Sequence, residues 1–488
     1  MRNCILLLLL GSLSVVQVLA KDIYVNDLKS LVQNTRESNV TLYICSPIDL
    51  EGKVLQLPAR TTLHIRNGKL FNGTLLGNKT KLLTDTPSCL GVIISGTWIV
   101  PIINDSCFTD LDDNAIMSNI NSLQSDECDN IILLYRDYDV NVDSKSFAAF
   151  VLKSNTKLYI HSSVKIKPNN YAKYAIVDIT HKQNVSIEGG VIIGDVGKHK
   201  YISNSTSEWG MGINVVASQN ITISNITISL CSGDGVYLGG FREDNIGVFE
   251  NACKNIRMSN VICNQNRRQG LSIVHAKDVT ISDCQFINTG QVEFTKPGHG
   301  IDIEPNISNN RNMSVSDVTI SRCKFMNNRR KSLSTAHYFC TDANSNINNI
   351  IIKDSYFYGE ITIRSGSFRI NNITIPKISV YLSTHNLGDI EINNSTISGG
   401  IYLHSSVADK NHSKYTGILT NFVLSNCHFT NQSKNKGNYI LALSGDMKRI
   451  KRLEFINCDF YKSGCGNKEI VNRRLRDFCV FKECEFKV

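Results

Sequence analysis

Four segments of this chain combine a glycine, a short apolar–polar alternation and side chains capable of acid–base chemistry. They read EWGMGINVV from Glu208, SGDGVYLGG from Ser232, NRRQGLSIV from Asn266 and PGHGIDIEPN from Pro297. Aligned on their glycines, all four have an apolar residue next, which predicts that this residue points inward and its successor outward. If the four strands stack in this alignment, one patch contains Asp234, Arg267, Arg268, His299, Asp302 and Glu304.

A patch of carboxyls, arginines and a histidine could break a glycosidic bond in two ways. Hydrolysis needs an acid and a base or nucleophile on either side of the bond, which Asp234, Asp302 and Glu304 could supply. Elimination next to a uronate carboxylate needs a base and a cation, which His299 and an adjacent arginine could supply. We expect hydrolysis, because three carboxylates would repel a uronate.

A purely structural interpretation of the same patch stays open. Arg268 could pair with Asp302 across neighbouring coils and simply neutralise a ladder, and His299 could bond a turn carbonyl. Other side chains near the patch are candidates for binding sugar, with Trp209 as a stacking surface in a loop beside a groove. These substrate-binding candidates are His199, Glu208, Trp209, Asn214, Tyr237 and Arg267. We expect no metal or cofactor, because the chain has no CxxC motif, clustered Cys/His pair or acidic calcium cluster.

The elements that must position these residues are predicted by a repeat. Phrases such as NVSIEGGVI from Asn184, NITISNITISLC from Asn220 and DVTISDCQF from Asp278 recur as far as LEFINCDF from Leu453. A unit that returns every few tens of residues is typical of a solenoid, and period-two alternation indicates strands. Each coil cannot bury its apolar face alone, so stacked coils share one interior. The sequence therefore predicts a right-handed parallel β-helix.

The chain of 488 residues is expected to contain three parts. Residues 1–20 are typical of a signal peptide, with Arg2 before an apolar run, and predict export to the periplasm or the outside of the cell. Residues 21–95 form a strand-rich extension, and residues 96–488 form the β-helix. Residues 108–124 have helical spacing with Asp112 or Asp113 as the cap, and predict a helix that covers the N-terminal end of the solenoid.

The 16 cysteines would suggest disulfides in an exported protein. Five of them instead lie two residues before a phenylalanine at the same place in the repeat, which predicts buried free thiols in an inward ladder. These are Cys284, Cys323, Cys427, Cys458 and Cys484. Cys465 and Cys479 lie outside the ladder and could form a bridge.

The segments DDNAIMSNINSL from Asp112, NIILLYRDYDV from Asn130, FVLKSNTKLYIHSSVKIKP from Phe150 and NVSIEGGVIIGD from Asn184 resemble the pectate-lyase superfamily of right-handed β-helix proteins. The resemblance covers about residues 105–480. It implies the fold, but that superfamily includes lyases, polygalacturonase-like hydrolases, epimerases and phage tailspikes, so it does not choose the reaction.

The layout is similar to that of the polygalacturonase family at GDG, Gly233–Gly235. The second aspartate of that family's motif is Gly235 here, and Gly-His-Gly comes one coil later than in that family, at Gly298–Gly300. Only Asp234 therefore carries over as a catalytic candidate from this likeness.

The sequence thus predicts an exported enzyme that cleaves a polysaccharide by hydrolysis with paired carboxylates. The catalytic candidates are Asp234, Arg268, His299, Asp302 and Glu304. The net charge of +9 suits an acidic polymer, whereas nucleic acid and a membrane span are not expected. A polysaccharide lyase and a non-catalytic glycan-binding or adhesin β-helix are the alternatives.

Overall fold

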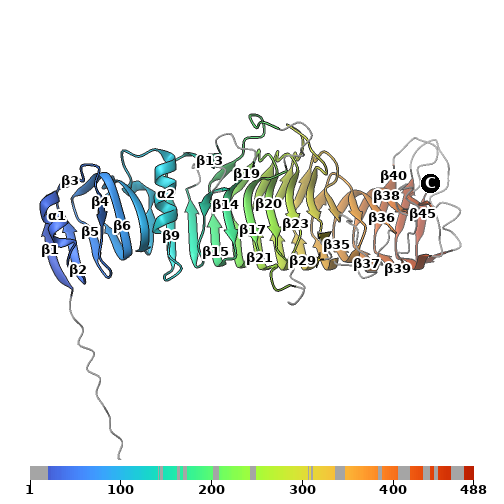
Figure 1. The fold of residues 1–488 in the computed structure, drawn as a ribbon. Coiled ribbons are helices and arrows are strands. Elements are labelled where there is room, and N and C mark those ends of the chain that lie inside the picture. Colours follow the sequence, from blue (N-terminus) through green and yellow to red (C-terminus); the bar gives the residue numbers. More distant parts are fainter. Residues whose placement is uncertain are drawn as a thin grey trace, which may run out of the picture. The chain divides into compact units, whose positions relative to one another are not determined.

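The computed structural model describes most of the chain, but not the expected signal peptide. The described residues are 20–140, 142, 147–161, 165–168, 173–201, 208–241, 249–305, 307–308, 311–335, 347–382, 387–404, 418–431, 440–444, 449–462 and 478–487. They divide into two compact units: Met1–Ile99 with Cys107–Asp110, and Val100–Ser106 with Leu111–Val488 (Figure 1).

The first unit is a sheet of seven described strands and one helix. Its strands are β1 (Lys21–Val25), β2 (Val40–Ile44), β3 (Pro47–Asp49), β4 (Val54–Gln56), β5 (Thr62–Ile65), β6 (Lys69–Thr84) and β7 (Leu90–Ile99). All of their pairings are parallel. Helix α1 (Leu28–Asn34) follows β1, and the Asp27 carboxylate caps it by accepting a hydrogen bond from the Ser30 N–H.

The second unit consists of two long parallel sheets whose strands alternate along the chain. One sheet has 22 described strands, from β10 (Tyr138–Val140) to β45 (Glu485–Lys487), and the other has 14, from β8 (Ile102–Asn104) to β44 (Cys479–Lys482). Successive coils stack on one another, as Figure 1 shows for the strands from β14 (Tyr174–Thr180) onward. This arrangement confirms the parallel β-helix predicted from the repeat.

Asparagines at the corners explain why the repeat begins with this residue. Asn155, Asn184, Asn220 and Asn255 have φ angles of 57°, 59°, 58° and 51°. Asparagine tolerates this left-handed conformation better than most residues do. Each Asn amide also donates to the Asn oxygen of the preceding coil, at 2.8, 2.9 and 2.8 Å. One residue type therefore turns the chain and links adjacent coils.

Helix α2 (Asp113–Leu123) lies within the segment predicted to be helical. Asp112 is its cap, because its carboxylate accepts a hydrogen bond from the Ala115 N–H at 2.8 Å. The buried face includes Ile116 and Ile120, and the helix packs against β10 and β11 (Ala148–Val151). It thus covers the first strands of the longer sheet.

The predicted ladder of cysteine and phenylalanine is confirmed, with one exception. Cys284, Cys323, Cys427 and Cys458 are buried free thiols, but Cys484 is only half-buried. The phenylalanines that follow them stack between coils; Phe286 and Phe325 have ring centroids 5.3 Å apart. Cys484 is less buried because it belongs to the last described coil, which nothing described covers. Cys465 lies outside the described residues, so its suggested bridge to Cys479 is not described either.

The four aligned segments form β17 (Gly210–Val216), β20 (Asp234–Gly239), β23 (Gln269–Ile273) and β26 (His299–Ile303). Their register places Ile213, Val236, Leu271 and Ile301 in one buried row. The glycines are required by close approach of the next coil. A Cβ on Gly235 would lie 2.7 Å from the Gly270 oxygen, and one on Gly270 would lie 2.5 Å from the Gly300 oxygen.

Candidate active site

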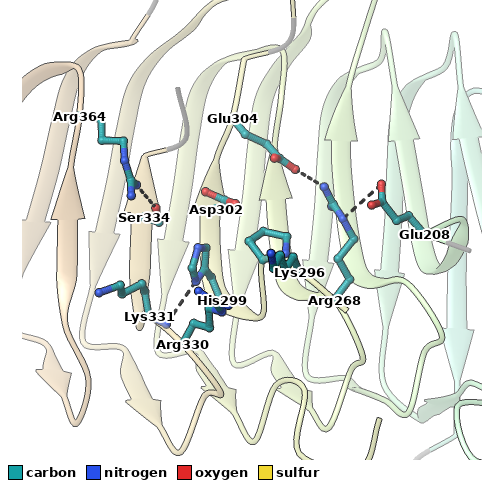
Figure 2. A pocket seen from close by; sticks show the side chains of 11 residues that line it. Glu208, Arg268, Lys296, His299, Asp302, Glu304, Arg330, Lys331, Ser334 and Arg364 are labelled. Carbon is teal, nitrogen blue, oxygen red and sulfur yellow. Dashed lines mark hydrogen bonds and ion pairs between the residues drawn. The ribbon is translucent and has the colours of Figure 1, made fainter. Parts of the chain in front are cut away.

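A pocket of about 450 Å³ opens on the longer sheet over β23, β26, β31 (Leu333–Thr335) and β34 (Ile361–Ile363). This volume is within the usual range of small-ligand sites. Five of its lining side chains are basic, and three carry carboxyl groups. The lining residues are Glu208, Arg268, Lys296, Pro297, His299, Asp302, Glu304, Arg330, Lys331, Ser334 and Arg364 (Figure 2).

Arg268 connects three carboxylates at one side of this pocket. Its Nη1 donates to Asp234 Oδ2 at 2.9 Å and its Nη2 to Glu304 Oε1 at 2.7 Å, while its Nε lies 3.7 Å from Glu208 Oε2. Burial alone would lower the pKa of Arg268, but Asp234 and Glu304 raise it well above its usual value. The guanidinium is therefore permanently charged and already neutralised by its neighbours.

Asp302 and Glu304 lie on one face of a strand but have opposite environments. Burial, and secondly the nearby Glu304 charge, raise the pKa of Asp302 well above its usual value. Its Oδ2 accepts a hydrogen bond from Gln269 at 2.8 Å, and its Oδ1 has no hydrogen-bond partner among the described residues. Glu304 instead forms an ion pair with Arg268. The two carboxyl groups therefore differ, because burial disfavours the charged form of Asp302 whereas Glu304 has a cationic partner.

His299 is held as a neutral imidazole. Its Nδ1 lies 3.2 Å from the Lys331 backbone N–H, which can only donate, so the ring hydrogen must be on Nε2. Burial lowers the pKa of His299 to about 3, and the positive charge of Arg364, followed by Lys331 and Arg330, adds to this effect. A ring of this kind can donate a hydrogen bond from Nε2 but is a weak base.

Asp234 supports the site from below and does not line the pocket. It is completely buried, with Arg268 and the Ser272 hydroxyl donating to its carboxylate, the latter at 2.7 Å. Burial raises its pKa to about 6, although Arg268 and Ser272 act in the opposite direction. Its contacts indicate that Asp234 positions Arg268.

Arg267 and His199 belong to a separate buried cluster. The Arg267 guanidinium lies 3.9 Å from the centre of the Tyr201 ring, and His199 Nδ1 lies 2.7 Å from Asp195 Oδ2. Tyr174 donates to the other oxygen of Asp195 at 2.8 Å. Neither Arg267 nor His199 lines the pocket, so the structure does not bring these two candidates to the others.

Three further substrate-binding candidates also lie outside the pocket lining. Trp209 is 46% exposed and its ring lies 6.2 Å from that of Tyr237, which packs on small buried residues of β11 and β14. Asn214 donates to Asp178 at 2.6 Å. Of the six candidates for binding sugar, only Glu208 lines the pocket.

The carboxyl groups of Asp302 and Glu304 are not exposed on the surface. Asp302 and Glu304 are only 1% and 5% exposed. The alternative in which Arg268 pairs with Asp302 is not observed, because the Arg268 guanidinium binds Asp234 and Glu304.

The alignment of four coils missed five lining residues: Lys296, Arg330, Lys331, Ser334 and Arg364. Lys296 comes from the loop before β26, and Lys331, Ser334 and Arg364 come from the next two coils. Extending the alignment by two coils would have found these last three. In the structure, Asp302 lies beside Ser334 of the next coil, and Ser334 lies beside Thr362 of the coil after it. The Arg-Arg-Lys run at residues 329–331 would then have come beside His299.

Within the described parts of the chain, no group of three or more His, Cys, Asp or Glu side chains could hold a metal ion. No helix there is long and apolar enough to cross a membrane.

Comparisons with known proteins place the fold but not the reaction. No family model matches the chain. The chain is 31% identical over 160 residues to the SPbeta prophage-derived uncharacterized protein YorA of Bacillus subtilis (strain 168); this match covers 31% of the chain and 27% of that protein. The chain thus spans less than a third of the length of this relative.

Two solved structures with similar folds are enzymes. The A-module of the mannuronan C-5 epimerase AlgE6 of Azotobacter vinelandii has a TM-score of 0.55 at 13% identity, covering 79% of this chain and 99% of that one. A family 28 exopolygalacturonase of Yersinia enterocolitica has a TM-score of 0.46 at 11% identity, covering 80% and 79%. The fold is therefore that of the pectate-lyase-like right-handed parallel β-helix proteins, as the sequence resemblance implied, and no particular family is identified.

Proposed function

We propose that this protein is a glycoside hydrolase that cleaves a polysaccharide, with Asp302 as the general acid and Glu304 as the base or nucleophile. The observation that carries the proposal is the difference between two carboxyls on one strand face. Asp302 is buried with an unpartnered oxygen, and Glu304 is ion-paired to Arg268. Glycosidases need one protonated and one ionised carboxyl group around the scissile bond.

The other residues of the pocket have supporting roles. Arg268 holds Glu304 through an ion pair, Asp234 holds Arg268, and His299 donates a hydrogen bond from Nε2 to a sugar oxygen. The fold supports an enzyme acting on a polymer, because the similar epimerase module is named for a polysaccharide substrate. We further propose that the protein is exported, on the basis of the signal-like residues 1–20.

A polysaccharide lyase is the second candidate, favoured by the basic side chains of the pocket. Cations could stabilise the anion formed when a proton is removed next to a uronate carboxylate. His299 is poorly suited to remove that proton, because its Nδ1 accepts the Lys331 N–H and its pKa is lowered to about 3. The hydrolase proposal is therefore preferred, and a non-catalytic glycan-binding protein is the remaining alternative.

The purified protein should release reducing ends from a polysaccharide in a panel, without ultraviolet absorbance from an unsaturated product. Asp302→Asn and Glu304→Gln should each lower the rate by about 10²- to 10⁴-fold, the usual contribution of a general acid or base. Asp139→Asn is the matched control, because Asp139 is an exposed carboxylate in an ion pair with Lys167 and lies outside the pocket.

Three results would contradict the hydrolase. Full activity of both variants would show that the carboxyls are structural. An unsaturated product that depends on His299 would establish the lyase. The wild-type protein could also bind a glycan tightly and yet cleave no member of the panel. That result would favour a binding protein.

A further inference from the structure

The basic residues of the pocket are not equivalent, because some already have carboxylate partners. Arg268 is paired with Asp234 and Glu304, and Lys331 Nζ lies 2.5 Å from Glu360 Oε2. These two charges are therefore largely neutralised within the protein.

Lys296 and Arg330 are different, since neither has an ion-pair partner among the described residues. The Arg330 guanidinium lies 5.7 Å from the centre of the Phe294 ring, which belongs to the same loop as Lys296. Both side chains line the pocket. They bring positive charge to it that no ion pair with a described carboxylate neutralises.

Arg364 is held in place by a stack of side chains. Its guanidinium lies 4.9 Å from the centre of the Tyr381 ring, and the other neighbour of that ring is His404, with centroids 4.4 Å apart and planes 15° apart. Arg364 Nη1 also donates to Ser334 Oγ at 3.1 Å and to the Thr335 carbonyl at 3.3 Å. Such a fixed guanidinium loses little conformational freedom when it binds an anion.

Charged side chains lie on both sides of Asp302. Figure 2 shows Arg364 and Lys331 on one side and Lys296, Glu304, Arg268 and Glu208 on the other. Asp302 lies between them, and burial raises its pKa well above its usual value, which disfavours a negative charge there. On the Arg364 side, the Glu360 carboxylate is already paired with Lys331 and Lys377, so it opposes an anionic sugar less than an unpaired carboxylate would. The carboxyl groups of the site are therefore a weaker objection to an acidic polymer.

We propose that Lys296, Arg330 and Arg364 form a subsite for the anionic group of an acidic polysaccharide, beside the sugar that Asp302 acts on. The subsite rests on the proposed function for its place next to a cleavage point. The group bound there is an oxyanion, either a uronate carboxylate or a sulfate ester, because a guanidinium can bind both with paired hydrogen bonds. Tyr381 is a positioning residue that holds Arg364.

The experiment measures binding, not cleavage, by affinity electrophoresis of the full chain carrying Asp302→Asn. The probes are polygalacturonate, its carboxyl-reduced form, chondroitin sulfate, desulfated chondroitin and a single-stranded oligonucleotide. At least one acidic glycan should retard the protein, and the carboxyl-reduced glycan should not. Retardation by polygalacturonate alone identifies a carboxylate. Retardation by chondroitin sulfate, but not by polygalacturonate or by desulfated chondroitin, identifies a sulfate.

Single variants then test the residues. Arg330→Gln and Arg364→Gln should each weaken binding by about tenfold, the value of one charge-assisted hydrogen bond of about 1.4 kcal/mol. Arg322→Gln is the control, because Arg322 is an exposed arginine paired with Asp283 outside the pocket. Tyr381→Leu should weaken binding and Tyr381→Phe should restore it, since only the ring is needed for the stack.

Several outcomes would overturn the subsite: equal binding of the carboxyl-reduced glycan, no binding of any acidic glycan, tighter binding of the oligonucleotide, or equal effects of Arg330→Gln and Arg322→Gln. The two proposals can fail separately. If binding depends on Arg364 but the wild-type protein cleaves nothing, the subsite stands and the hydrolase fails. If a neutral glycan is cleaved through Asp302 and acidic glycans do not bind, only the subsite fails.

Discussion

The protonation of His299 can be tested through stability. Its pKa in the folded protein is lowered from 6.5 to about 3, mainly by burial. Below about pH 6.5 the unfolded chain binds a proton at this ring and the folded chain does not, so stability falls as the pH drops toward 3. At about pH 4 the difference is 2.5 pH units, which corresponds to about 3 kcal/mol lost relative to neutral pH.

The assay is urea unfolding of wild type and His299→Gln at about pH 7.5 and about pH 4. Wild type should lose about 3 kcal/mol more than the variant between the two conditions, because glutamine does not titrate. Comparing the change with pH removes any constant cost of losing the contact to Lys331. His181→Gln, at an exposed histidine, is the control and should behave like wild type. Equal losses in wild type and His299→Gln would refute the argument and make His299 available as a base again.

Two further predictions concern the scaffold. Gly235→Ala should lower stability by about 1–3 kcal/mol, because its Cβ would meet the next coil, whereas Gly197→Ala, with open space around it, should change little; urea midpoints measure both, and equal midpoints would contradict the close approach. The buried thiols Cys284, Cys323 and Cys427 should resist a thiol reagent in the native protein and react after denaturation, and equal labelling in both states would disprove their burial.

The fold could be predicted because one unit is repeated many times. Three features of the sequence indicate the same coil geometry. They are asparagine at corners such as Asn184 and Asn220, cysteine and phenylalanine that point inward, and glycine where coils approach each other. An error in one unit is corrected by its neighbours. The glycine alignment was predictable for the same reason, and it placed Asp302 beside Ser272 in the observed register.

The environment of each site residue could not be predicted in the same way. The alignment fixes which residues are adjacent, but not how far a long side chain reaches over the next coil. Arg268 could reach Asp302 or Glu304, and the structure shows that it reaches Glu304. Arg267 has the same type and nearly the same place in its coil, yet it turns to Tyr201. Side-chain direction, which the repeat does not encode, therefore decides which candidates line the pocket.

The choice made by Arg268 also explains how one strand can hold an acid and a base. If Arg268 paired with Asp302 instead, the ion pair would favour the ionised form of Asp302, which could then not donate a proton. Because Arg268 binds Asp234 and Glu304, Asp302 has no cationic partner in this contact. Burial then dominates its pKa and favours the protonated form. Asp234 thus contributes without lining the pocket, because it fixes the direction of the guanidinium. A change at Asp234 should therefore act on the protonation of Asp302 through Arg268.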